Sequence, residues 1–157
     1  MEPNFHIVLF HPEIPHNTGA AGRLALATAS RLHLIKPLGF SLDEKHVRRT
    51  GLDYWAKVDL HVWDTIEDLQ ASAEPDARFW YLTTKVNSTH WETSFRRGDY
   101  LVFGPESKGL PASIIQSNKS TAITIPMPGE GSRSLNLSTA IAITLYEGIR
   151  QISLPSA

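Results

Sequence analysis

Apolar residues in this chain are concentrated in short runs, each closed by proline, glycine or polar residues. Runs of this length, rich in β-branched and aromatic residues, are typical of buried strands. They predict strands at residues 5–10, 32–35, 60–63, 78–83, 100–103 and 122–125.

Several segments between these runs carry apolar residues at helical spacing instead. Helices are predicted within residues 16–31 and over residues 43–50, 65–73 and 136–151. Asn17 or Thr18 is expected to cap the first of them, because both side chains can accept a hydrogen bond from a free backbone N–H. In the last helix, Ile141, Leu145 and Ile149 fall on one stripe that is wide enough to bury.

Strands and helices alternate along the chain, which is typical of an α/β fold. We therefore predict a mostly parallel sheet with helices on both faces. The length of 157 residues fits one domain, residues 1–157, and no internal repeat or long linker interrupts it. Ligands of such sheets bind beyond the carboxyl ends of the strands, so the glycine-rich loops after Phe103 and Ile125 are expected to carry the chemistry.

The composition is that of a soluble globular protein, with 41% hydrophobic and 20% charged residues. Cysteine is absent, which excludes disulfides, thiolate zinc sites and cysteine nucleophiles. The first residues carry an acid and only a short apolar run, unlike a signal peptide, and no stretch approaches the ~20 apolar residues of a membrane helix. We expect a cytoplasmic protein with no membrane partner.

The formal net charge of −1 argues against a strongly basic nucleic-acid binder, but the positive charges are clustered. One cluster consists of Lys45, His46, Arg48 and Arg49, and a second of Arg96 and Arg97. Such clusters occur on solvated helix faces and on surfaces that hold nucleic-acid phosphates, and the residues alone leave both interpretations open.

Three familiar motifs are incomplete. Residues 104–109 have the glycine spacing of a phosphate-binding loop, but Leu110 replaces its lysine, so nucleotide hydrolysis is not expected. Gly129 and Gly131 begin a dinucleotide fingerprint whose third glycine is missing. The seven histidines form no HExxH pair, and we expect no metal site.

Three other segments together resemble the sequence motifs of the SPOUT methyltransferases. Residues 15–23 (PHNTGAAGR) resemble the first motif, and residues 103–111 (FGPESKGLP) resemble the second. Residues 125–127 (IPM) followed by 132–138 (SRSLNLS) resemble the third, and the order and spacing extend over nearly the whole chain. The likeness is greatest to the short TrmL (YibK-like) group, to which residues 48–54 (RRTGLDY) also contribute.

This resemblance implies a C-terminal deep trefoil knot, the SPOUT fold, and a homodimer. It also implies S-adenosyl-L-methionine as methyl donor, with S-adenosyl-L-homocysteine as product and no metal. The implied reaction is 2′-O-methylation of the wobble nucleotide, C34 or U34, in the anticodon stem-loop of tRNA, with leucine isoacceptors as expected substrates. An rRNA ribose methyltransferase and a non-catalytic RNA-binding module are the alternatives.

The resemblance also assigns roles to individual residues. Those expected to bind the cofactor are Leu82, Thr83, Gly104, Ile125, Met127 and Ser134. Those expected to act in catalysis are Arg23, Glu106, Ser134 and Asn136, of which Asn136 can also cap the last helix. Since arginine stays protonated in proteins, we expect Arg23 to hold a phosphate and stabilise oxygen charge rather than to accept a proton.

Basic and aromatic residues near these motifs are candidates for RNA contacts. We expect Lys45, Arg48, Arg49 and Arg133, together with Lys85, to hold RNA phosphates. Tyr54 and Trp55 could stack on an unpaired base, although Trp55 fits a hydrophobic core equally well.

Overall fold

The computed structural model describes residues 2–42 and 54–155. Within them, six strands form one sheet in the order β3-β2-β1-β5-β4-β6, and every neighbouring pair is parallel. The strands are β1 (His6–Phe10), β2 (Arg31–Ile35), β3 (Leu60–Trp63), β4 (Phe79–Leu82), β5 (Tyr100–Phe103) and β6 (Ala122–Ile123). The expected parallel α/β sheet is confirmed.

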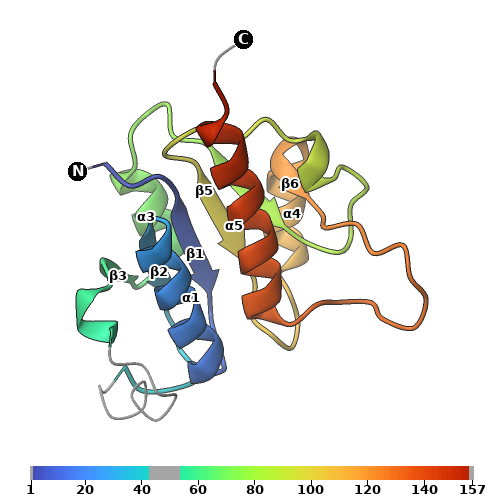
Figure 1. The fold of residues 1–157 in the computed structure, drawn as a ribbon. Coiled ribbons are helices and arrows are strands. Elements are labelled where there is room, and N and C mark those ends of the chain that lie inside the picture. The colour runs from blue at the N-terminus through green and yellow to red at the C-terminus, as the bar shows by residue number, and fades with distance from the viewer. Residues whose placement is uncertain (1, 43–53, 156–157) are drawn as a thin grey trace.

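Helices cover both faces of the sheet, as expected. The α-helices are α1 (Pro15–Ala27), α3 (Ile66–Ser72), α4 (Ala112–Ser117) and α5 (Leu137–Ser153). Short 3-10 helices are η1 (Trp55–Lys57), η2 (His90–Glu92) and η3 (Lys119–Thr121). In Figure 1, α1 and α5 lie side by side in front of the sheet, with α3 and α4 behind it.

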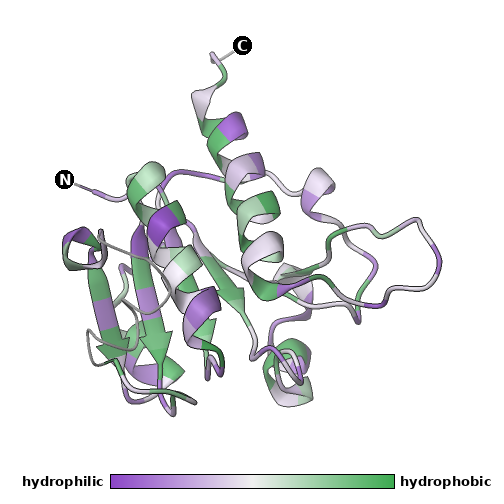
Figure 2. Cartoon of the chain, turned by 60° about the horizontal axis from the view of Figure 1, so that its bottom comes forward, coloured by the Kyte–Doolittle hydropathy of each residue, from purple (hydrophilic) through white to green (hydrophobic). Residues whose placement is uncertain are grey.

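The alternation of side chains along each strand explains these two layers. On β1, Ile7 and Leu9 point to the face where Ile141 of α5 is fully buried. Val8 points to the other face and joins the cluster that contains Leu69 of α3. Because both faces of the central strands β1 and β5 are covered, all of their residues are buried, and the strands in Figure 2 are green along much of their length.

The start of α1 differs from the sequence-based expectation. The helix begins at Pro15, with Ile14 at the N-cap position and no side-chain cap from its own segment. Proline favours the first helical position because its φ is preset and it has no N–H to satisfy. Asn17 and Thr18 therefore lie inside the first turn, where both are buried.

The structure corrects the end of one strand, adds one helix and leaves two expectations untested. The last strand ends at Ile123 rather than at residue 125, because Thr124 forms only an isolated bridge with Thr89. Helix α4 was not predicted. The helix expected at residues 43–50 lies outside the described residues, and the trefoil knot stays a prediction.

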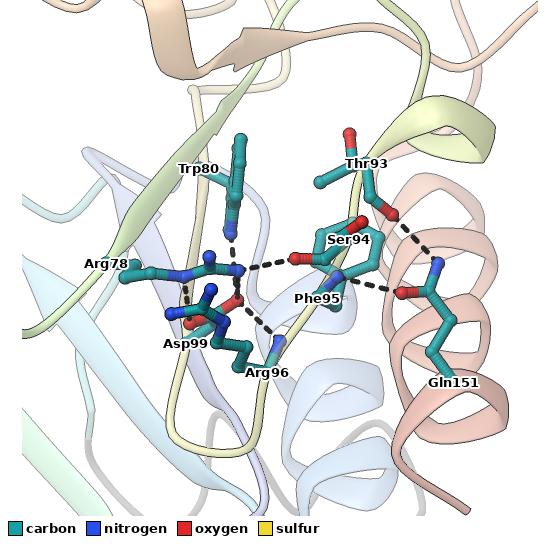
Figure 3. Close-up of polar contacts among 8 residues, drawn as sticks. All are labelled: Arg78, Trp80, Thr93, Ser94, Phe95, Arg96, Asp99 and Gln151. Carbon is teal, nitrogen blue, oxygen red and sulfur yellow. Dashed lines mark hydrogen bonds and ion pairs between the residues drawn. The ribbon is translucent and has the colours of Figure 1, made fainter. Parts of the chain in front are cut away.

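A buried carboxylate holds together the amino ends of β4 and β5 (Figure 3). Asp99 accepts hydrogen bonds from Arg78 Nε and Nη2 at 3.0 and 2.8 Å, and from Trp80 Nε1 at 2.9 Å. The backbone N–H of Arg96 donates to the same carboxylate at 2.8 Å. A single acidic side chain thereby fixes the segment that enters β5.

Gln151 of α5 binds the same segment from the other side (Figure 3). Its Oε1 accepts from the backbone N–H of Phe95 at 2.8 Å, and its Nε2 donates to the carbonyl of Thr93 at 2.9 Å. The C-terminal half of α5 is therefore anchored to the loop before β5. In the part of the chain that the structure describes, no helix is both long and apolar enough to cross a membrane.

Candidate active site

A cavity of about 370 Å³ lies at the carboxyl ends of β4, β5 and β6, where the loops after these strands meet the start of α5. Most of its wall comes from loop residues 83–85, 104–110, 124–125, 127 and 133–135. Its location is the one expected for ligand binding in a parallel α/β sheet. Its volume falls within the range of sites for small molecules and cofactors.

All six residues expected to bind the cofactor line this cavity. They are Leu82, Thr83, Gly104, Ile125, Met127 and Ser134. Glu106 and Arg133 line it too, whereas Arg23 and Asn136 do not. Residues separated by more than forty positions along the chain are thus brought together, although their roles toward a ligand stay predictions.

Gly104 is required by the close return of its own loop. A Cβ at this position would lie 2.2 Å from the backbone N of Leu110 and 2.3 Å from the carbonyl carbon of Gly109. Gly109 has a φ of +70°, a conformation that favours glycine. The two glycines let the loop fold tightly along one wall of the cavity.

Two glutamates hold this loop against the start of α1. The carboxylate of Glu106 accepts from the backbone N–H groups of Glu13 and Ile14, both at 2.8 Å. In return, the carboxylate of Glu13 accepts from the N–H and hydroxyl of Ser107 at 2.8 and 2.9 Å. These hydrogen bonds from Ser107 lower the pKa of Glu13.

Asn17 extends the connection to α5. Its Nδ2 donates to Glu106 Oε2 at 3.1 Å, and its Oδ1 accepts from Asn136 Nδ2 at 3.4 Å. Asn136 caps α5 as expected, because its Oδ1 accepts from the N–H groups of Ser138 and Thr139 at 3.0 and 3.4 Å. The three motif segments are therefore joined by one chain of polar contacts.

Arg23 lies on a different side of α1. It lies six positions after Asn17, which corresponds to about 9 Å along the helix axis and a rotation of roughly 240°. Its side chain is exposed, and its guanidinium carbon lies 5.6 Å from the ring centroid of Tyr54. The Tyr54 hydroxyl donates to the carbonyl of Gly19 at 3.0 Å. Within one chain, Arg23 therefore faces Tyr54 and not the cavity.

The expected RNA-binding residues fall into two groups. Lys85 and Arg133 line the cavity, and Lys108, which the sequence reasoning did not single out, joins them. Lys45, Arg48 and Arg49 lie outside the described residues. Trp55 packs against the core and against Gly22 of α1, which favours the core interpretation of this side chain.

Sequence reasoning missed Glu13 and the linking role of Asn17. A visible signal was the acidic residue one position before the Ile-Pro pair that starts α1. Among the residues that the structure describes, no cluster of histidine and acidic side chains is arranged to hold a metal ion.

Comparison with known proteins gives consistent matches. Residues 4–146 match the SpoU rRNA methylase family. A tRNA (cytidine(34)-2′-O)-methyltransferase of Saccharophagus degradans is 49% identical over 152 residues, with 94% of this chain and 96% of that protein covered. A structure solved to give insights into the 2-OH methylation of C/U34 on tRNA superposes with a TM-score of 0.88, at 43% identity, covering 94% of this chain and 95% of the other.

A more distant structural neighbour supports the fold alone. It is the SpoU methyltransferase AviRb of Streptomyces viridochromogenes in complex with its cofactor AdoMet. The two chains superpose with a TM-score of 0.77 at 24% identity, covering 96% of this chain and 59% of the other.

Proposed function

This chain belongs to the SpoU rRNA methylase family, and we propose that it methylates the 2′-hydroxyl of the wobble nucleotide, C34 or U34, of tRNA with S-adenosylmethionine as donor. The observation that carries the proposal is the cavity at the carboxyl ends of β4, β5 and β6, lined by every residue expected to bind the cofactor. The relatives' full-length identity supports the choice of tRNA over rRNA.

The chemistry of the cavity wall fits S-adenosylmethionine. Gly104 and Gly109 line the cavity without side chains, and backbone N–H and C=O groups can hydrogen-bond an adenine edge. Leu82, Ile125 and Met127 supply apolar surface for the adenosine rings. When bound, the sulfonium supplies an electrophilic methyl group.

The protein's own contribution is positioning and electrostatics. Transfer to an oxygen requires that donor and acceptor be held at about 3–3.5 Å and that water be excluded. Lys85, Lys108 and Arg133 place positive charge on the cavity walls, where RNA phosphates can be bound. The Arg23 guanidinium stabilises the negative charge that develops on the ribose oxygen during transfer.

A second copy of the chain explains how Arg23 reaches a cavity. Arg23 does not line the cavity of its own chain, so we propose that a homodimer brings it to the cavity of the partner. Ile143 and Tyr146 of α5 are 37% and 47% exposed, and they provide an apolar surface for such a contact. We propose that the enzyme acts in the cytoplasm on tRNA.

Labelled methyl transfer tests this function. Purified protein and tritiated S-adenosylmethionine should label a tRNA pool at position 34, and Arg23→Ala should remove the labelling while calorimetry still detects cofactor binding. Lys119→Ala, an exposed charge on η3, is the matched control and should leave labelling intact. Labelling confined to rRNA would favour the rRNA enzyme, and RNA binding without cofactor binding would favour the non-catalytic module.

Mixed dimers test the second copy. Arg23→Ala lacks the arginine, and Gly104→Ala has a distorted cavity. Each variant alone should be nearly inactive when the S-adenosylmethionine concentration is well below the weakened Kd of Gly104→Ala. Mixing them after dissociation should restore up to about a quarter of the activity, because half of the dimers are mixed and each has one intact site. Absence of recovery with confirmed subunit exchange would contradict the placement of Arg23 in the partner's site.

A further inference from the structure

Tyr54 touches α1 at the turn that carries Arg23, and it does so with two different parts of its side chain. The hydroxyl donates to the carbonyl of Gly19, and the ring lies beside the guanidinium of Arg23. In an α-helix, the carbonyl of residue 19 is also the acceptor for the backbone N–H of residue 23. The hydroxyl thus fixes Tyr54 to the turn from which Arg23 projects.

The ring restricts a side chain that is otherwise little constrained. Arg23 is exposed, and it forms none of the ion pairs found among the described residues. A free arginine samples many rotamers, and holding it in one orientation removes part of that entropic cost before it acts. An aromatic face 5.6 Å from its guanidinium carbon offers an attractive electrostatic contact for one of those orientations.

The adjacent residue fixes the backbone of this segment against α1. Trp55 lies against α1 where a glycine leaves room for it: a Cβ at Gly22 would lie 2.6 Å from the Trp55 ring. Trp55 and Val58 also pack against the main core cluster. Trp55 and Val58 therefore hold residues 54–58 against α1, and the hydrogen bond from the Tyr54 hydroxyl to Gly19 keeps the ring beside Arg23.

We propose that Tyr54 is a positioning residue for methyl transfer: its ring holds the Arg23 guanidinium in the orientation used at the reaction site, and its hydroxyl anchors the ring to α1. The inference rests on the proposed function, since it assumes that Arg23 acts on the RNA. The proposed role does not require Tyr54 to stack on a base, because its half-buried ring already contacts the guanidinium of Arg23.

Two substitutions separate the parts of the side chain. Tyr54→Leu removes the ring and should lower kcat between about threefold and thirtyfold, the range that corresponds to a cation–π contact. The KM for tRNA and the Kd for S-adenosylmethionine should stay within about twofold. Tyr54→Phe keeps the ring and should lose about threefold or less. Trp91→Leu, which removes an aromatic side chain that is 66% exposed on η2, is the control and should leave kcat unchanged.

A spectroscopic measurement tests the contact without any activity. The Nε–H resonance of Arg23, assigned by its loss in Arg23→Lys, should be shifted by the ring current in the native protein and in Tyr54→Phe. In Tyr54→Leu it should return to the position of a free arginine. This measurement on the native protein and Tyr54→Phe remains decisive if Tyr54→Leu does not fold.

Three results would overturn the proposal. An unshifted Arg23 resonance in the native protein would mean that the ring does not hold the guanidinium. A raised KM for tRNA with unchanged kcat in Tyr54→Leu would assign Tyr54 to base stacking. If kcat and KM are both unchanged in Tyr54→Leu, Tyr54 does not contribute to the reaction. If the native protein methylates no RNA, the proposed function fails, whereas the resonance still decides whether Tyr54 holds Arg23.

Discussion

Glu13 and Glu106 lie 93 positions apart in sequence, and each accepts hydrogen bonds from the other's loop. The carboxylate of Glu106 satisfies backbone N–H groups of Glu13 and Ile14 at the start of α1, which have no partner inside a helix. The negative charge also lies at the positive end of the helix dipole. In this structure Glu106 therefore positions the helix that carries Arg23, instead of contacting Arg23 itself.

Glu106→Gln should loosen this junction. An amide keeps one acceptor oxygen, but its NH2 group would face a backbone N–H that now donates to a carboxylate oxygen. We expect the free energy of unfolding to fall by about 1–3 kcal/mol and kcat to fall with it. Urea unfolding and single-turnover methylation measure the two effects. Unchanged values for both would show that the junction contributes little.

Gly104→Ala should distort the loop that forms one wall of the cavity. The added methyl group would overlap the backbone of residues 109 and 110, which cannot yield as a flexible side chain would. We expect at least tenfold weaker binding of S-adenosylmethionine, on the order of 1.4 kcal/mol. Gly129→Ala is the matched control: a Cβ there meets no atom within 4 Å, so calorimetry should give a native Kd.

Asp99→Ala should be strongly destabilising. The side chains of Asp99 and Arg78 are only 3% and 26% exposed, and removal of the acid leaves the guanidinium, an indole N–H and a backbone N–H without their acceptor. We expect a loss of about 3 kcal/mol or more in the free energy of unfolding. Asp59→Ala, whose ion pair with Arg31 is largely solvated, should cost less than about 1 kcal/mol. Equal losses in the two variants would contradict this ranking.

Two buried histidines should make the stability of the protein depend on pH. Trp63 Nε1 donates to His33 Nδ1 at 3.0 Å, so that nitrogen must be unprotonated, and His33 Nε2 lies 2.8 Å from His6 Nδ1. Burial, reinforced by the nearby Arg31 and His61 and only partly offset by Asp59, lowers the pKa of His6 from 6.5 to about 4. Burial, together with His6, His61 and Arg31, lowers the pKa of His33 to about 2.

The direction of the effect follows from these pKa values. Below pH 6.5 the unfolded chain binds protons at both rings while the folded protein does not, so the free energy of unfolding falls as pH decreases. The slope approaches about 1.4 kcal/mol per pH unit for each ring between pH 6.5 and 4. Urea unfolding at pH 7, 6 and 5 measures it. His6→Phe should make the slope shallower, whereas a steepness equal to that of the native protein would exclude His6 as a contributor.

Much of the fold follows from local sequence patterns. Strands such as β1 and β5 are short apolar runs because both of their faces are buried, and the spacing of Ile141 and Leu145 places both of them against the sheet. The glycines and prolines that end these runs marked the loops where the cavity lies. The short helix α4 escaped prediction because six residues contain too few turns to show a period.

What the sequence alone determined is the order of strands and helices, the layers they form and the loops that line the cavity, because hydrophobic period and turn residues act over a few neighbouring positions. Only the tertiary structure decided that Glu106 replaces a local cap for α1, that Asn17 joins Glu106 to Asn136, and that Arg23 rests on Tyr54. Those contacts join distant segments, and they depend on how the chain crosses the sheet, which no local pattern specifies.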